Sequence, residues 1–176
     1  MNIKGDITIL RACEPQDLGL FRRVYKNEKV RTYQISKTIH DIDMSIEDWR
    51  KALNDNMSYY QLTIAAKDET GLGFLQFNNI DWKNGSIQLE FAVDPDHDQR
   101  EHLKDALTAA AKFVFGNMRF ETIVIYCLAH DADKKNLLEE IGFIQDALLR
   151  SRILRENKRY DLALYTLLPS DLKTSF

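Results

Sequence analysis

One acidic side chain of this sequence is a candidate general base. Glu90 lies in the segment 85–94 (GSIQLEFAVD), where it alternates with the apolar residues Leu89 and Phe91. Alternate side chains of a strand point to opposite faces, so Glu90 faces away from a core-side run formed by Ile87, Leu89, Phe91 and Val93. A carboxylate in such a place can take a proton from a reacting group. The alternative is an acid that is solvated or ion-paired on a half-exposed sheet.

The histidines offer a second candidate base and argue against a metal site. His130 follows the apolar segment 122–129, where it is either a base or an ordinary surface histidine. His97 and His102 lie among acidic residues, but their five-residue spacing does not put two imidazoles on one helical face. No third ligand accompanies them, so the sequence predicts no metal.

Composition sets the broad class of the protein. A chain of 176 residues is one domain's worth of sequence, so we expect 1–176 to form a single domain. Hydrophobic residues make up 44% and charged residues 29%, which is typical of a globular protein. The formal net charge of −3 gives no general reason to bind nucleic acid or an anionic membrane.

The chain shows no signal for export or for membrane insertion. The first residues, MNIKGDITIL, hold no apolar stretch of signal-peptide length, and no window approaches the roughly 20 apolar residues of a membrane span. Cys13 and Cys127 are isolated from each other, which favours buried thiols in a reducing compartment over a disulfide. We therefore expect a cytoplasmic protein.

The elements that must hold the candidate side chains follow from the hydrophobic pattern. Residues 6–13 alternate as a strand does, and the spacing after Pro15 predicts a helix. Ser45 is a suitable N-cap for a second, short helix over 45–56. Three strands are predicted next, over 59–68, 71–82 and 85–94. Asn84–Gly85 joins the last two and favours a type I′ turn, since both residues tolerate positive φ.

The second half of the chain continues this mixture of helices and strands. A long helix, a nearly all-apolar strand, a short helix ended by Gly142 and two final strands are predicted over 99–118, 122–129, 133–142, 147–157 and 159–168. Asn157–Lys158 is the expected turn of the last hairpin. The order β-α-α-β-β-β-α-β-α-β-β predicts an α/β fold, with a mixed central sheet and helices on its faces.

This order and three short strings resemble the GNAT N-acetyltransferase superfamily. The strings are LEFAVDP before the long helix, Leu138-Glu139-Glu140-Ile141-Gly142-Phe143 after the apolar strand, and Tyr160-Asp161 in the last strand. The resemblance covers essentially the whole chain and is greatest to the branch that contains ribosomal-protein N-terminal and amino-sugar acetyltransferases. It implies a GNAT-like sheet whose fourth and fifth strands, 86–94 and 122–129, run parallel and splay apart.

The resemblance also implies a reaction. A family member transfers an acyl group from acetyl-CoA or another acyl-CoA to a primary amine of a small metabolite, an amino sugar or a peptide. Carried over to this chain, the donor would be held by the end of the fourth strand and the start of the long helix, which are Phe91, Ala92, Val93, Arg100, Glu101, His102, Leu103 and Lys104. The catalytic candidates are Glu90 and His130 as bases and Tyr160 as the acid, with Tyr126 and Tyr165 as alternatives for the acid.

The donor motif departs from the family pattern, which has glycines that let the backbone approach pyrophosphate. Gln99, Glu101 and Leu103 stand at the places of these glycines, and Asp98 and Glu101 form a capping box that would satisfy the same N–H groups. Arg100 and Lys104 offset this only in part, so weak donor binding is expected. Leu138 replaces the tyrosine that many members use as the proton donor.

Two functions therefore remain open on the sequence alone. The first is an N-acyltransferase, and the second is a catalytically idle GNAT fold that serves as a binding or regulatory module. The acceptor, the acyl group and the oligomeric state are not determined, and a homodimer is one assembly that stays open.

Overall fold

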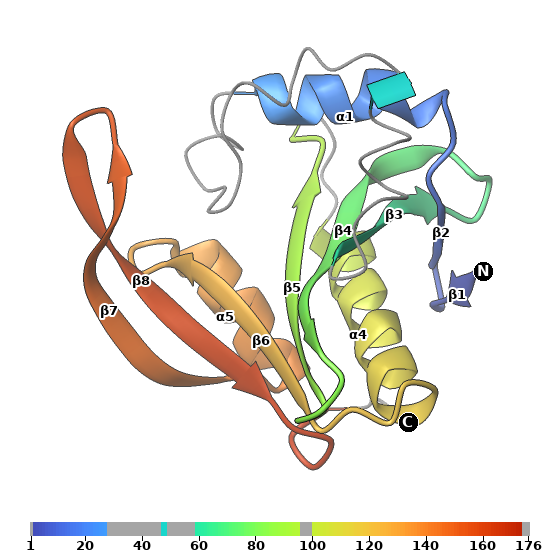
Figure 1. Ribbon diagram of the computed structural model, residues 1–176. Coiled ribbons are helices and arrows are strands. Elements are labelled where there is room, and N and C mark those ends of the chain that lie inside the picture. The colour runs from blue at the N-terminus through green and yellow to red at the C-terminus, as the bar shows by residue number, and fades with distance from the viewer. Residues whose placement is uncertain (1, 28–46, 49–58, 96–99, 174–176) are drawn as a thin grey trace.

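The computed structural model describes residues 2–27, 47–48, 59–95 and 100–173. They form one eight-stranded sheet, in the order β1-β2-β3-β4-β5-β6-β8-β7, with helices on both of its faces (Figure 1). The mixed α/β fold that the sequence predicts is therefore confirmed.

The first half of the chain contributes five strands and one long helix. These elements are β1 (Ile3–Lys4), β2 (Thr8–Ala12), α1 (Asp17–Lys26), β3 (Tyr59–Ala66), β4 (Gly71–Asp81) and β5 (Ser86–Val93). Strand β1 was not predicted, because two residues are too few to show the alternation of apolar and polar side chains that indicates a strand. The helix predicted over 45–56 lies outside the described residues except for Glu47 and Asp48, which are helical.

The second half matches its predicted elements within a few residues. It contains α4 (Arg100–Gly116), β6 (Thr122–Leu128), α5 (Ala132–Ile141), β7 (Ile144–Arg155) and β8 (Lys158–Leu167). Gly142 ends α5 with a φ of 121°, a conformation that glycine adopts without a Cβ clash.

The two central strands form a fork. β5 and β6 are parallel neighbours, but they pair only from Ser86–Thr122 to Gln88–Val124. Beyond these residues β5 continues to Val93 and β6 to Leu128, and the two strands diverge toward the top of Figure 1. The predicted parallel pair that splays apart is therefore confirmed.

The two faces of the sheet carry different helices. A large core beneath α4 and α5 includes Leu89 and Phe91 of β5 and Ile125 of β6, together with the alanine-rich side of α4. On the other face α1 places Leu20, Phe21 and Val24 against Phe74 and Ala92, which together form a smaller core. Residues of β5 therefore alternate between the α4 face and the α1 face.

Both hairpin turns differ from their predicted form. Between β4 and β5 the loop has four residues, because Asp81 pairs with Ser86 and its carboxylate accepts the N–H groups of Lys83 and Asn84. Only Gly85 has positive φ, so the type I′ prediction at Asn84–Gly85 was wrong. In the last hairpin, Glu156 and Asn157 take φ of 46° and 61°, which sets the turn one residue before the predicted one.

A carboxylate on α4 fixes the turn between β1 and β2. Asp105 accepts hydrogen bonds from the backbone N–H groups of Asp6, Ile7 and Thr8 at 2.8, 3.0 and 2.8 Å, and from the Thr8 hydroxyl at 2.6 Å. Burial alone would raise the pKa of Asp105, but these hydrogen bonds outweigh it and the pKa is lowered. A Cβ on Gly5 would clash with this carboxylate, so the turn requires glycine there.

We expect Asp105→Ala to lower the free energy of unfolding by about 2–3 kcal/mol, since four hydrogen bonds lose their acceptor. The measurement is urea denaturation of the variant beside Asp68→Ala, which removes an exposed carboxylate that accepts the N–H of Thr70. The control should lose less than about 1 kcal/mol. Equal losses in the two variants would show that Asp105 does not hold the turn.

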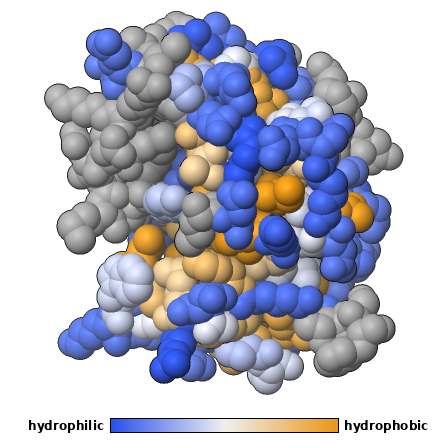
Figure 2. Space-filling view, turned by 90° about the vertical axis from the view of Figure 1, so that its right-hand side faces the viewer, coloured by the Kyte–Doolittle hydropathy of each residue, from blue (hydrophilic) through white to orange (hydrophobic). Residues whose placement is uncertain are grey.

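The surface on the β1–β2 side of the molecule is mainly hydrophilic, with apolar residues gathered near its middle (Figure 2). Among the described helices, none combines the length and the apolar character that a membrane crossing requires.

Candidate active site

Glu90 lies at the fork, on the α1 face of β5. It stands two residues beyond Gln88, where the pairing with β6 ends. Its exposed fraction is only 8%, which argues against a solvated acid, so an ion-paired acid is the alternative that remains beside the general base. The amide nitrogen of Asn78 lies 3.5 Å from its Oε2. A carboxylate this buried is held in place by its surroundings, which suits a group that must meet a substrate at one fixed point.

Glu90 belongs to a polar row that crosses three strands. The register places Gln61 of β3 opposite Gln76 of β4, and Gln76 opposite Glu90. All three side chains are buried, and the Gln76 amide donates to Gln61 Oε1 at 2.8 Å. We call these residues, Gln61, Gln76 and Glu90, the polar row.

Helix α1 adds a hydroxyl to the polar row. Gln76 Nε2 also donates to the hydroxyl oxygen of Tyr25, at 3.0 Å. The Tyr25 ring stacks on Phe74, with centroids 4.9 Å apart, so its hydroxyl is fixed from both sides. The position of α1 on the sheet thus decides where the Tyr25 hydroxyl lies.

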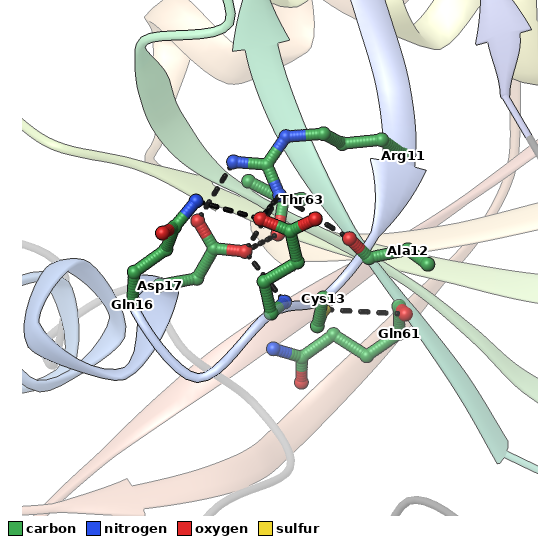
Figure 3. A network of polar contacts seen from close by, with 8 residues as sticks. Arg11, Ala12, Cys13, Gln16, Asp17, Gln61 and Thr63 are labelled. Atoms are coloured by element: carbon green, nitrogen blue, oxygen red, sulfur yellow. Dashed lines mark hydrogen bonds and ion pairs between the residues drawn. The ribbon is translucent and has the colours of Figure 1, made fainter.

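A buried ion pair anchors α1 to the sheet (Figure 3). Arg11 of β2 binds Asp17 with two hydrogen bonds, of 2.8 and 2.9 Å, and Thr63 of β3 donates to the same carboxylate at 2.9 Å. The N–H of Glu14 adds a fourth bond at 2.8 Å. Burial alone would raise the pKa of Asp17, but the bonds from Arg11, Glu14 and Thr63 outweigh it and lower the pKa.

Across the fork, the residue level with Glu90 is Tyr126. Gln88 and Val124 are register partners, and Glu90 and Tyr126 each follow two residues later on the same face. Tyr126 is half-buried. Of the tyrosines considered for the acid, the register therefore favours Tyr126.

His130 and Tyr160 lie together but farther along the fork. Their rings are 5.2 Å apart, and the ammonium of Lys158 lies 5.3 Å from the Tyr160 ring centroid. His130 lies in the turn two residues past the end of β6, and Tyr160 stands on β8 two residues beyond Leu162, the partner of Leu128. This pair thus lies well beyond the level of Glu90, on the opposite side of the fork.

Tyr165 lies on the α5 face, away from Glu90. Its hydroxyl donates to Glu139 Oε1 at 2.9 Å, and its side chain is fully buried. Burial, together with the hydrogen bond to Glu139, raises the pKa of Tyr165 above its usual value. A tyrosine in this state is a weak proton donor, so Tyr165 is the least suited of the alternatives.

The cysteines do not belong to the site. Both thiols are free, and Cys127 is buried in the large core. Burial raises the pKa of Cys13 to about 11 and also raises that of Cys127. These thiols stay protonated near neutral pH and are poor nucleophiles.

The predicted donor residues of β5 point alternately to the two faces of the sheet. Phe91 points into the large core, and the ammonium of Lys134 from α5 lies 4.5 Å from its ring centroid. Ala92 points to α1 instead, and Val93 is half-buried. Beyond Gln88 the β5 backbone has no ladder partner in β6, which leaves its peptide groups on that edge able to bond a linear ligand with amides.

The predicted donor residues of α4 are engaged in different ways. Leu103 is buried in the large core, so only its backbone can reach a ligand. Arg100 and Lys104 form ion pairs with Glu140 of α5, at 2.6 and 3.3 Å. Hydrogen bonds from both cations lower the pKa of Glu140. Glu101 is exposed and His102 is half-buried.

The predicted capping box includes Asp98, which lies outside the described residues, as do Gln99 and His97. Within the part of the chain that the structure describes, no group of three or more histidine, cysteine and acidic side chains is arranged to hold a metal ion.

The family follows from a comparison with known protein families. Residues 8–144 match the family model of the acetyltransferase (GNAT) domain. This chain belongs to the GNAT acetyltransferase family. A search of curated proteins finds no match to the sequence.

Solved GNAT structures share the fold of this acetyltransferase domain. A GNAT-family acetyltransferase from Bacillus anthracis superposes with a TM-score of 0.77 at 20% identity, over 96% of this chain and 98% of its own. A spermidine N-acetyltransferase from Vibrio cholerae, in complex with CoA and spermine, gives a TM-score of 0.82 at 16% identity, over 93% and 96%. At these identities the likeness extends to the fold alone.

Sequence reasoning missed several residues of this site. The polar row beyond Glu90, the Tyr25 hydroxyl and the role of Glu140 all depend on contacts between distant segments. A single sequence carries no signal for such contacts. Tyr126 was named from the sequence only as an alternative for the acid, and it is the β5–β6 register that sets it level with Glu90.

Proposed function

We propose that this GNAT protein is an acyl-CoA-dependent N-acyltransferase that moves an acyl group, acetyl in the first instance, to a primary amine. The observation that carries the proposal is the position of Glu90. It is a buried carboxylate, two residues past the point where β5 and β6 separate, with Tyr126 level with it on the other strand. A base and an acid then flank the gap in which an acyl donor and an amine would meet.

The residues divide the chemistry between them. Glu90 takes the proton from the amine, directly or through one water, so that the nitrogen lone pair can attack the thioester carbon. The new C–N bond forms as the C–S bond breaks, and the electron pair leaves with sulfur. Tyr126 gives its hydroxyl proton to the departing thiolate. Asn78, whose amide nitrogen lies 3.5 Å from Glu90 Oε2, helps to position the base, and Gln61 and Gln76 continue the polar row on β3 and β4.

The donor fits the fork through two features of the chain. Beyond Gln88, where the pairing of β5 with β6 ends, the β5 edge offers peptide groups to the amides of an acyl-CoA arm. Arg100 and Lys104 supply positive charge for its phosphates at the start of α4. Because the glycines of the family motif are missing here, donor binding should be weak.

The acceptor is a primary amine of a small metabolite, an amino sugar or a peptide. One negative charge in an otherwise uncharged polar row suits an amine that arrives as an ammonium. Spermidine is a sensible first candidate, since one similar structure is a spermidine N-acetyltransferase bound to CoA and spermine.

A second candidate function is an idle GNAT fold that acts as a binding or regulatory module. The observation that favours it lies on the donor side, where Arg100 and Lys104 are already paired with Glu140. The absence of the glycines of the family's pyrophosphate motif also favours the idle module.

Calorimetric titration of acetyl-CoA and of longer acyl-CoAs into the protein separates these two functions at the donor step. The enzyme requires saturable binding of at least one acyl-CoA. If none of these thioesters binds, the idle module is the better account.

A further inference from the structure

Two helices of the donor side are joined by three charged side chains. Arg100 Nη2 lies 2.6 Å from Glu140 Oε1, and Lys104 Nζ lies 3.3 Å from Glu140 Oε2. Each carboxylate oxygen therefore has its own cation. The two cations are one helical turn apart on α4 and present the same side of that helix to α5.

Further contacts link α5 to α4 and to β5. Arg100 Nη1 donates to the backbone oxygen of Asp133 at 3.4 Å, so this guanidinium contacts both ends of α5. Lys134 of α5 covers the ring of Phe91 on β5, 4.5 Å from its centroid. Helix α5 thus contacts α4 and the part of β5 that lies beyond its pairing with β6, the two elements to which the proposed function assigns the donor.

We propose that Glu140 sets the affinity of this protein for acyl-CoA by competing with the donor's phosphates for Arg100 and Lys104. The inference rests on the proposed function for the identity of the donor. A carboxylate and a phosphate oxygen bind guanidinium and ammonium groups with the same geometry. Glu140 thus occupies the same cations that a donor phosphate needs, and the donor must break two ion pairs to gain its own.

Exposure decides the size of the effect. The side chains of Arg100, Lys104 and Glu140 are 39%, 37% and 45% exposed, so solvent screens each pair. Screened pairs are weak, and their loss can be compensated by a ligand. Removing the Glu140 charge should tighten CoA binding by about three- to tenfold.

The test compares Glu140→Gln with Glu121→Gln by calorimetry. Both variants remove one negative charge, but Glu121 is an exposed residue immediately before β6, outside this cluster. The probes are CoA and S-acetylpantetheine, a thioester without phosphate groups. We expect Glu140→Gln to bind CoA about three- to tenfold more tightly, with unchanged affinity for S-acetylpantetheine, while Glu121→Gln changes neither.

A variant that lacks both cations separates competition for them from a merely structural effect of Glu140→Gln. In the double variant Arg100→Gln/Lys104→Gln, adding Glu140→Gln should no longer tighten CoA binding, since the cations at issue are gone. An equal gain in this background would overturn the proposal. So would an equal gain in Glu121→Gln, or no gain in Glu140→Gln.

Failure of the proposed function has a different signature. Suppose that Glu140→Gln tightens CoA binding as expected but no variant transfers an acyl group to any amine. The proposed competition by Glu140 is then supported, and the proposed N-acyltransferase function is refuted. If neither the native protein nor Glu140→Gln binds CoA, the competition itself is refuted.

Discussion

Replacing Glu90 by glutamine should lower turnover by about 100-fold or more and leave the affinity for acetyl-CoA nearly unchanged. Glutamine keeps the size and the hydrogen-bonding capacity of the side chain but cannot accept the amine proton, and general base catalysis contributes on this order. Glu90 is 8% exposed and lies on the α1 face, opposite the side chains that face α4, so donor contacts should survive the change. Steady-state turnover and calorimetric donor binding measure the two effects.

A matched variant tests the acid in the same way. Tyr126→Phe removes the proposed acid, so it should also slow turnover and leave the affinity for acetyl-CoA nearly unchanged. Native turnover in Glu90→Gln would remove Glu90 from the mechanism and leave a water relay or His130 as the candidate base.

Replacing Asp17 by asparagine should lower the free energy of unfolding by about 3 kcal/mol. The change leaves Arg11 without its partner in a largely buried place, where removal of one charge of a pair is costly. The side chains of Arg11 and Asp17 are only 11% and 5% exposed. The control is Glu14→Gln, whose carboxylate lies 3.9 Å from Arg11 and is 54% exposed, and which should cost less than about 1 kcal/mol.

At acid pH, the free energies of unfolding of the native protein and of Asp17→Asn should become equal. The pKa of Asp17 is lowered in the folded state. Its contribution to stability is therefore complete above the unfolded value, which is about 3.9, and is lost as the pH falls through the folded value. Denaturation curves at neutral pH and at several acid pH values check this. A gap between the two proteins that stays constant across the acid range would contradict the assignment.

The elements of this fold could be read from the sequence because local pattern determines them. The alternation in 85–94, the apolar run in 122–129 and the helical period in 99–118 each describe a short window, and each matches its strand or helix. The resemblance to the GNAT family, which rests on the order of these elements and on three short strings, then predicted the fork between β5 and β6.

What the sequence could not supply were contacts between distant windows. Asp105 accepts its hydrogen bonds from residues 97 to 99 positions away, and Arg100 pairs with Glu140 forty positions away. The turn at Asn84–Gly85 failed for a related reason, because the Asp81 side chain reshapes it. At the site, Glu90 was found because its acidic type breaks an apolar strand, whereas Gln61 and Gln76 look like ordinary polar residues.

The central claim is acyl transfer to an amine, and its most direct measurement is the release of free CoA from acetyl-CoA with and without added amine. The native protein would be supplied in turn with spermidine, an amino sugar and a peptide, and the acetylated product identified by mass spectrometry. We predict amine-dependent release for at least one acceptor, matched by an equal amount of N-acetylated product and nearly abolished in Glu90→Gln. Saturable binding of acetyl-CoA with no amine-dependent release for any acceptor would contradict the account.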